Sequence, residues 1–553
     1  MVRQRTGGRF AIALIAVWAV FLGLIVGGCG LSNGDPPRVA ELTPVTIALE
    51  RIGGFEGGTP GAAEITAFDA GSKRLFVVNG ANGSVDVLDL ANPTNPAKVA
   101  TISASGLGAS VNSVAVHEGL VALAIEATRK TDPGVVALYN ASDLVRREVI
   151  TVGALPDMVT FTPDGRHILV ANEGEPNSYG AADSVDPEGS VSIITVNRSG
   201  GASTVATADF RAFNGQEDAL RSQGIRIFGP GANAAKDLEP EYIAVSADSR
   251  TAWVTLQENN AVAIVDIAAA RVTALRALGF KDHNLAGMGL DASDEDGVLN
   301  SNTGTPAINI VQRPLRGMYQ PDAIASYFAQ GQTFLITANE GDAREWPGLT
   351  EEVRVRAHCP NGLDPTVFPD AANLVLDSNL GRLRVTAFPN GNRSGKNAAG
   401  QCTELWSYGA RSFSTWNADL ARQYDSGDEL EQRTRNLSVA PFNASHDNTT
   451  LDGRSAAKGP EPEGVAVTTF GNKTYAFIGL ERIGGVMVYD ITVPQAPVFT
   501  TYLNTRNGVT GDRGPEGITI IPAAQSPNAR PLLIVGNEVS GSTAIYAINV
   551  TYQ

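Results

Sequence analysis

The feature that most constrains this chain is an internal repeat that recurs seven times between residues 65 and 550. Each copy has an apolar strand, a polar turn, a second apolar strand, a Gly/Asn turn and an alternating strand. The clearest copy places these strands at Tyr242–Ser246, Ala252–Glu258 and Ala261–Ile267. Units of three or four antiparallel strands bury their faces against their neighbours, so seven copies predict an all-β, seven-bladed β-propeller.

Two segments depart from the repeat. A propeller closes when a strand from one terminus joins the last blade, and Val45–Arg51 has the pattern to supply that outer strand. The fifth copy begins with Ala323–Tyr327 and Thr333–Glu340 but continues only at Glu404–Trp416. We therefore expect the fifth blade to carry long insertions, at about residues 341–403.

The N-terminus has the pattern of an export signal. Arg3, Arg5 and Arg9 precede the uncharged run Phe10–Val26, which ends in the lipobox-like Val26-Gly27-Gly28-Cys29. This predicts a lipoprotein held at the membrane by a lipid on Cys29, in a bacterial cell envelope, at the cell surface or outer membrane. The alternative is an uncleaved membrane anchor. The expected organisation is a signal peptide at 1–28, a tether at 29–44 and the propeller at 45–553.

The composition limits the classes of partner that this chain is expected to bind. The chain has 553 residues and a net charge of −16, from 42 basic and 58 acidic residues, so we expect no nucleic-acid partner. With Cys29 lipidated, Cys359 and Cys402 remain. In an oxidising compartment two such thiols predict one disulfide, which would close an Asn- and Gly-rich loop.

Acidic residues fall at two fixed positions of the repeat. One row ends the second strand, at Glu126, Glu173, Glu258, Glu340, Glu481 and Glu538. The other follows a proline just before the first strand, at Asp157, Glu241, Asp322, Glu463 and Glu516. Because these two strands are antiparallel, both rows should crowd around one mouth of the central channel.

Crowded carboxylates repel unless they bind cations or take up protons. Oxygen ligands of this kind suit Ca²⁺, which we expect as the bound ion. The candidate ligands are Glu173, Glu241, Glu258, Glu340, Glu463, Glu481, Glu516 and Glu538. The alternative is structural: proline–acid pairs commonly begin turns, and duplication alone would repeat them. The acidic run Asp291–Asp296 lacks the register of an EF-hand, and we expect it to be a solvated loop.

Several longer motifs resemble the choice-of-anchor I family. The likeness covers roughly residues 45–553, and the motifs that carry it are Leu169–Asn177, Asp186–Val191, Leu238–Tyr242, Gly317–Asp322, Thr337–Arg344, Lys458–Gly464 and Gly514–Gly517. The resemblance implies a secreted or surface-held propeller whose means of attachment varies between members. The family includes proteins labelled alkaline-phosphatase-like and an animal surface glycoprotein from mesenchyme.

Three functions fit these observations. The first is a ligand-binding or adhesion module with a Ca²⁺-binding mouth, recognising a surface ligand or glycan, since the chain has no identifiable nucleophile. The second is a metal-dependent phosphomonoesterase acting on a phosphoester, with Arg344 and Arg482 as phosphate-binding residues. The third is a scaffold that binds no ion. Whether the protein is an enzyme stays open at this point.

Overall fold

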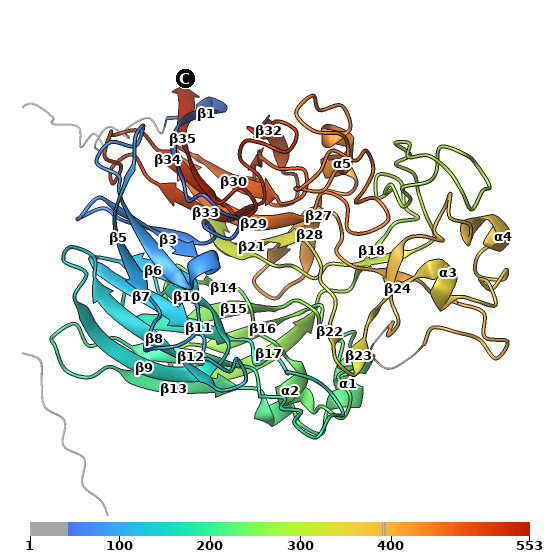
Figure 1. Ribbon diagram of the computed structural model, residues 1–553, viewed down its shortest axis with the longest axis horizontal. Coiled ribbons are helices and arrows are strands. Elements are labelled where there is room, and N and C mark those ends of the chain that lie inside the picture. Colours follow the sequence, from blue (N-terminus) through green and yellow to red (C-terminus); the bar gives the residue numbers. More distant parts are fainter. Residues whose placement is uncertain (1–41, 390, 392–393) are drawn as a thin grey trace, which may run out of the picture. The chain divides into compact units, whose positions relative to one another are not determined.

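Seven four-stranded antiparallel sheets contain most of the strands in the computed structural model (Figure 1). The structure describes residues 42–389, 391 and 394–553. The predicted signal peptide, Cys29 and most of the predicted tether lie outside these residues. Each repeat forms one sheet of four strands, in agreement with the three or four that the sequence predicted.

Within each sheet the strands follow one another in chain order, apart from β1, which joins the last sheet. The seven sheets consist of β2–β5 (Thr66–Asp69, Arg74–Asn79, Ser84–Asp89, Ala97–Ser103); β6–β9 (Val111–His117, Leu120–Ile125, Pro133–Asn140, Arg146–Ala154); β10–β13 (Pro156–Phe161, His167–Asn172, Ser190–Thr195, Thr204–Asp209); β14–β17 (Ile243–Val245, Thr251–Leu256, Ala261–Asp266, Arg271–Ala277); β20, β21, β27 and β28 (Ile324–Ala329, Gln332–Asn339, Ser412–Asn417, Arg422–Asp425); β29–β32 (Pro462–Phe470, Lys473–Leu480, Val486–Asp490, Val498–Leu503); and β33–β35 with β1 (Pro515–Ile521, Leu532–Asn537, Ser542–Tyr552, Pro44–Glu56).

The first strands of the seven sheets contact one another in a closed cycle. β2 contacts β6, β6 contacts β10, and the contacts continue through β14, β20, β29 and β33 back to β2. A closed cycle of antiparallel sheets is the arrangement of a β-propeller. It brings the beginning of every first strand to a common centre.

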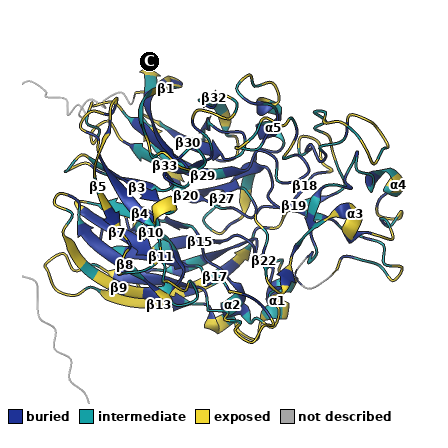
Figure 2. Cartoon of the chain, viewed as in Figure 1, coloured by how far each residue is buried: buried dark blue, intermediate teal, exposed yellow. Residues whose placement is uncertain are grey.

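Burial follows the position of each strand within its sheet. The second and third strands are almost entirely buried, as in β11 and β12, whereas fourth strands such as β13 are largely exposed (Figure 2). The middle strands carry runs of Val, Ile, Leu and Ala because both of their faces pack against neighbouring sheets.

The N-terminal strand closes the last sheet. β1 pairs with β35 along its whole length, from Pro44 opposite Tyr552 to Glu56 opposite Ser542. This confirms the prediction that Val45–Arg51 supplies an outer strand. The pairing ties the first described residues to the last ones, and hydrogen bonds between the two strands hold the cycle shut.

The expected insertion lies between β21 and β27, which pair directly. The third strand of this sheet begins at Ser412, not at Glu404 as the sequence predicted, because β26 (Trp406–Ser407) joins β18 and β19 (Phe280–Asp282, Arg316–Met318) instead. The other inserted elements are β22–β25 (Glu345–Trp346, Leu349–Thr350, Glu352–Arg354, Arg384–Thr386), α3 (Val355–His358) and α4 (Ala371–Leu374). Short helices elsewhere are η1 (Gly80–Asn82), η2 (Arg211–Phe213), α1 (Glu217–Ser222), α2 (Ala234–Asp237) and α5 (Glu429–Thr434).

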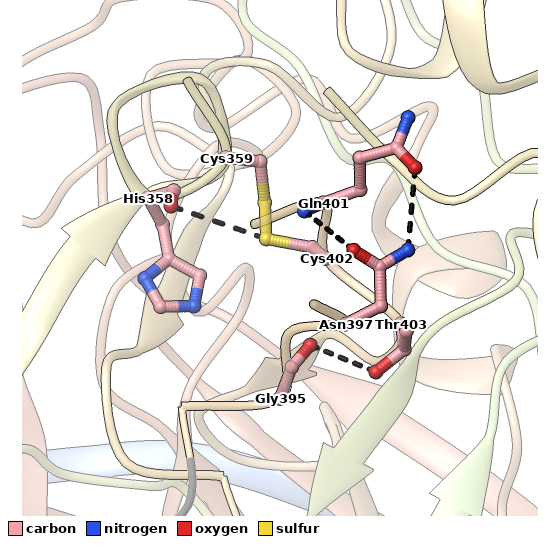
Figure 3. The surroundings of a disulfide bond; sticks show 7 residues. All are labelled: His358, Cys359, Gly395, Asn397, Gln401, Cys402 and Thr403. Atoms are coloured by element: carbon pink, nitrogen blue, oxygen red, sulfur yellow. Dashed lines mark hydrogen bonds between the residues drawn. A yellow bond between two sulfur atoms is a disulfide. The ribbon is translucent and has the colours of Figure 1, made fainter. Parts of the chain in front are cut away.

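The insertion has a small core of its own. Cys359 and Cys402 form the predicted disulfide, and both are buried (Figure 3). They pack with Leu290 and Leu315, which belong to the connection that precedes β20. The sequence did not indicate that this connection contributes to the same core.

Loss of the disulfide should loosen the insertion. The bond closes a loop with a sequence separation of 43 residues, and removing a cross-link of this length costs about 2–4 kcal/mol through the entropy of the unfolded segment. We expect the Cys359→Ser, Cys402→Ser double variant to be cleaved faster within residues 340–411 in limited proteolysis. Reduction of the wild-type protein should reproduce this effect and leave the double variant unchanged. Equal cleavage of reduced and oxidised protein would contradict the prediction.

Candidate functional site

The two predicted rows of acids meet at the centre of the cycle of sheets. A cavity of about 340 Å³ is lined by residues of β2, β6, β10, β29 and β33, and by residues just before β14 and β20. All seven sheets therefore contribute to its wall. The carboxylates that line it are Asp157, Asp322, Glu463 and Glu516.

Glu64 belongs to the same row, although the repeat pattern did not reveal it. It lies just before β2, and its amide donates a hydrogen bond to the carbonyl of Val78. A side chain at Gly80 would collide with the Glu64 carboxylate, since a Cβ built there lies 2.2 Å from Glu64 Oε1. Glu64 thus fills the space left where this repeat has Gly80 in place of an acid. It escaped notice because no proline precedes it.

Buried asparagines fix the strand ends from which several of these acids extend. Asn172 donates side-chain hydrogen bonds to the hydroxyls of Ser190 and Ser192 on the next strand. Asn339 makes the same two bonds to Ser412 and Ser414. The asparagines that precede Glu173 and Glu340 therefore have a structural role: they fasten the second strand to the third at the point where the glutamate leaves the sheet.

Burial and mutual repulsion shift the pKa values of the acids around the cavity. Burial raises the pKa of Glu241, Glu463 and Glu516 well above the usual range, and neighbouring carboxylates raise it further. Burial raises the pKa of Glu64 and Asp157 to about 7. The neighbours that act on Glu516 are Glu64, Glu538, Asp322 and Asp157, from four different sheets. Acids far apart in the sequence are therefore close in space.

One group of three carboxylates, which we call the Glu241 triad, consists of Glu173, Glu241 and Glu258. One oxygen from each lies within 4.8 Å of the other two. Glu241 and Glu258 are buried, and one oxygen of each has no hydrogen-bond partner in the described part of the chain. Oxygens about 2.4 Å from a shared Ca²⁺ lie at most about 4.8 Å apart, so this spacing fits such an ion.

A second group has its own counter-charges. Glu340, Glu461 and Glu481 also bring their oxygens within 4.8 Å. Lys458 Nζ lies 2.7 Å from Glu340 and 3.1 Å from Glu461, while Arg482 lies 3.0 Å from Glu461 and 2.7 Å from Glu481. Arg454 also pairs with Glu461. Although burial opposes ionisation, these three cations lower the pKa of Glu461. The group is an ion-pair network that needs no metal to balance its charge.

Both arginines suggested as phosphate ligands are paired with carboxylates. Arg344 is buried and lies 2.9 Å from Asp237 and 2.8 Å from Glu239. Arg482 belongs to the ion-pair network above and also donates a hydrogen bond to His446. A phosphate would have to displace these carboxylates to reach either guanidinium group. For Arg344 the sequence could not reveal this, because its partners Asp237 and Glu239 come from a different sheet connection.

The cycle of sheets and the channel at its centre define this chain as a β-propeller protein. A model of the choice-of-anchor I domain matches residues 64–494, which is most of the chain. The protein belongs to the choice-of-anchor I family, as its motifs indicated.

Two curated proteins are distant relatives. Gigasin-3a from Magallana gigas is 28% identical over 191 residues, which cover 31% of this chain and 66% of that protein. The mesenchyme-specific cell surface glycoprotein of Strongylocentrotus purpuratus is 25% identical over 401 residues, covering 62% of this chain and 48% of that protein. The chain thus spans between about half and two thirds of the length of the curated relatives it matches.

Solved structures with a similar fold include three proteins of low sequence identity. Kuenenia stuttgartiensis hydrazine synthase has a TM-score of 0.43 and 12% identity, and the match covers 90% of this chain and 97% of that chain. The Myceliophteria thermophila Cps50 (Swd1) β-propeller domain has a TM-score of 0.42 and 9% identity, with coverage of 91% and 100%. The WD40 domain of Toxoplasma gondii coronin has a TM-score of 0.45 and 9% identity, with coverage of 92% and 88%. Within residues 42–553 as described, no helix has the length and apolar character needed to cross a membrane.

Proposed function

We propose that this protein is a surface-held, seven-bladed β-propeller that binds Ca²⁺ at the Glu241 triad and serves as a ligand-binding or adhesion module. Each of the seven four-stranded sheets would be one blade. The proposal of a surface location rests on three features: family membership, the surface glycoprotein among the relatives, and the lipobox at Cys29. Lipid on Cys29 would hold the propeller at the membrane of a bacterial cell envelope.

The observation that carries the Ca²⁺ proposal is the pair of unpartnered, buried oxygens on Glu241 and Glu258. A buried carboxylate oxygen without a donor is costly, and a divalent cation would remove that cost for the whole triad at once. The acids Asp157, Asp322, Glu463 and Glu516 would then form a wall of carboxyl groups around a cavity large enough for a small polar ligand group. The bound ligand would be a surface glycan or peptide that offers positive or hydrogen-bond donor groups.

The phosphomonoesterase alternative lacks comparable support. It needs free cationic groups for the phosphate, and Arg344 and Arg482 are each engaged by two carboxylates. A binding module needs an ion site but no catalytic group, and the Glu241 triad would be sufficient for that purpose.

Ca²⁺ binding is tested on the purified protein by equilibrium dialysis against ⁴⁵Ca²⁺. We expect Glu258→Gln to weaken binding at this site at least tenfold, because one ligand oxygen loses its charge while the side chain keeps its shape. Glu118→Gln is the matched control, since Glu118 is an exposed acid on a turn. Unchanged affinity in the Glu258 variant, relative to this control, would remove the basis of the proposal.

A further inference from the structure

Another group of three carboxylates lies outside the lining of the channel cavity. Asp291, Asp296 and Asp452 each offer an oxygen within 4.8 Å of the other two, and we call them the Asp452 triad. Their exposed fractions are 0%, 5% and 0%. The sequence predicted a solvated loop at residues 291–296, and for Asp291 and Asp296 this was wrong. The reason is that the loop packs against α5 and the connection after it: the Asp291 amide donates a hydrogen bond to Glu431, and Asp452 brings an oxygen within 4.8 Å of both acids.

One oxygen of the triad lacks a donor, and so does a neighbouring amide oxygen. Asp452 Oδ2 is buried without a hydrogen-bond partner in the described part of the chain, and so is Asn443 Oδ1. Asn443 already uses its amide nitrogen on Glu431 and Ser455, each at 2.8 Å, so its carbonyl oxygen is left over. Ser455 also donates to the other oxygen of Asp452, which places Asn443 beside the triad. An amide oxygen and three carboxylates form a donor set that Ca²⁺ prefers.

The positive groups nearby do not balance this charge. Arg411 is buried and pairs with Glu431 at 2.8 Å, and its remaining donors go to backbone carbonyls. Arg313 is the other neighbouring cation, and it donates to Asn379 and makes no ion pair within 4.0 Å in the described residues. Arg411 and Glu431 cancel, so Arg313 leaves a net charge of about −2 on the ionised triad. Burial raises the pKa of Asp291 to about 9 and that of Asp452 to about 8, as expected for acids without a counter-ion.

We propose that Asp291, Asp296, Asp452 and the Asn443 side chain bind a Ca²⁺ ion that is separate from the channel mouth. The ion would fasten two connections that the sheets leave unpaired: the one before β20, which carries Asp291 and Asp296, and the one before β29, which carries Asn443 and Asp452. The first of these also packs in the core around the disulfide, through Leu290 and Leu315. The site would therefore stabilise the inserted region against its neighbouring sheet.

The two Ca²⁺ sites are distinguished by stoichiometry and by hydrogen–deuterium exchange, measured on the full chain. We expect two equivalents of tightly bound Ca²⁺ in the wild type, and one in each of Asp452→Asn and Glu258→Gln. Ca²⁺ should slow exchange at residues 285–313 and 441–458 at least tenfold. Glu258→Gln should keep that protection, and Asp452→Asn should lose it. Loss of the channel site alone would therefore leave this result intact.

Asn is close in shape to Asp, and the substitution removes a buried acid that would repel its neighbours when ionised, so Asp452→Asn should melt at or above the wild-type temperature in chelator. The wild type should gain thermal stability from Ca²⁺ and the variant much less. If Asp452→Asn fails to fold, Asp296→Asn takes its place. The proposal would be overturned if a folded variant of the triad kept the Ca²⁺-dependent protection. It would also be overturned if Ca²⁺ did not change the exchange rate of these segments in the wild type.

Discussion

Replacing Arg344 with methionine should destabilise the protein by about 3–5 kcal/mol, the usual cost of removing one partner from a buried ion pair. Arg344 is 2% exposed, and it holds Asp237 through Nη1 and Glu239 through Nη2. Both acids are themselves buried, at 0% and 1% exposure. Methionine fills a similar volume but leaves two carboxylates without a counter-charge. The measurement is the midpoint of urea unfolding at neutral pH.

Arg250→Met provides the matched control. Arg250 lies 4.0 Å from Asp248, and both side chains are mostly exposed, so its removal should cost no more than about 0.5 kcal/mol. The comparison also separates two roles for Arg344. A phosphate-binding arginine would tolerate substitution without loss of stability, whereas an arginine that neutralises buried acids would not. Equal unfolding midpoints for the two variants would exclude the structural role.

The regular part of the fold could be predicted from the sequence because its signal is local. Each repeat shows its own strands and turns, and the Pro-acid step before the first strand marks the same position in five copies. The convergence of the acids then follows from strand direction alone, since antiparallel neighbours begin and end at one face. Glu64 was missed because the first repeat lacks the proline by which the other acids of this row were recognised.

The irregular part could not be predicted because its contacts join distant segments. Lys458 and Arg454 neutralise Glu461, yet nothing in their local sequence separates them from solvated basic residues. Asp291 and Asp452 meet only because two long connections pack together, and no repeat relates them. The sequence identified which residues carry charge. Which of those charges are buried, and which are paired, depends on tertiary packing.

The protein without added metal should lose stability as the pH rises from about 5 to about 8. Glu64 and Asp157 have a pKa raised to about 7 in the folded protein, against ordinary values near 4 in the unfolded chain. Between these values the folded state binds more protons than the unfolded state, so the free energy of unfolding falls with rising pH. A rise from 4.5 to about 7 corresponds to about 3 kcal/mol for Glu64, and a rise from 3.8 to about 7 corresponds to about 4 kcal/mol for Asp157. Partial exposure of these side chains reduces the contribution of each to about 1–3 kcal/mol.

The measurement is a series of urea unfolding curves from pH 5 to pH 8 in the presence of chelator. Glu64→Gln should flatten the curve of stability against pH, because its amide stays neutral at every pH and removes one charge from the neighbourhood of Glu516. Glu56→Gln is the control, since Glu56 is an exposed acid at the end of β1. Its pH dependence should match that of the wild type. A wild-type stability that rises steadily over this range would mean that the carboxylates at the channel are ionised and stabilised by groups other than one another. The carboxylates at the channel mouth would then not require a bound cation to balance their charge.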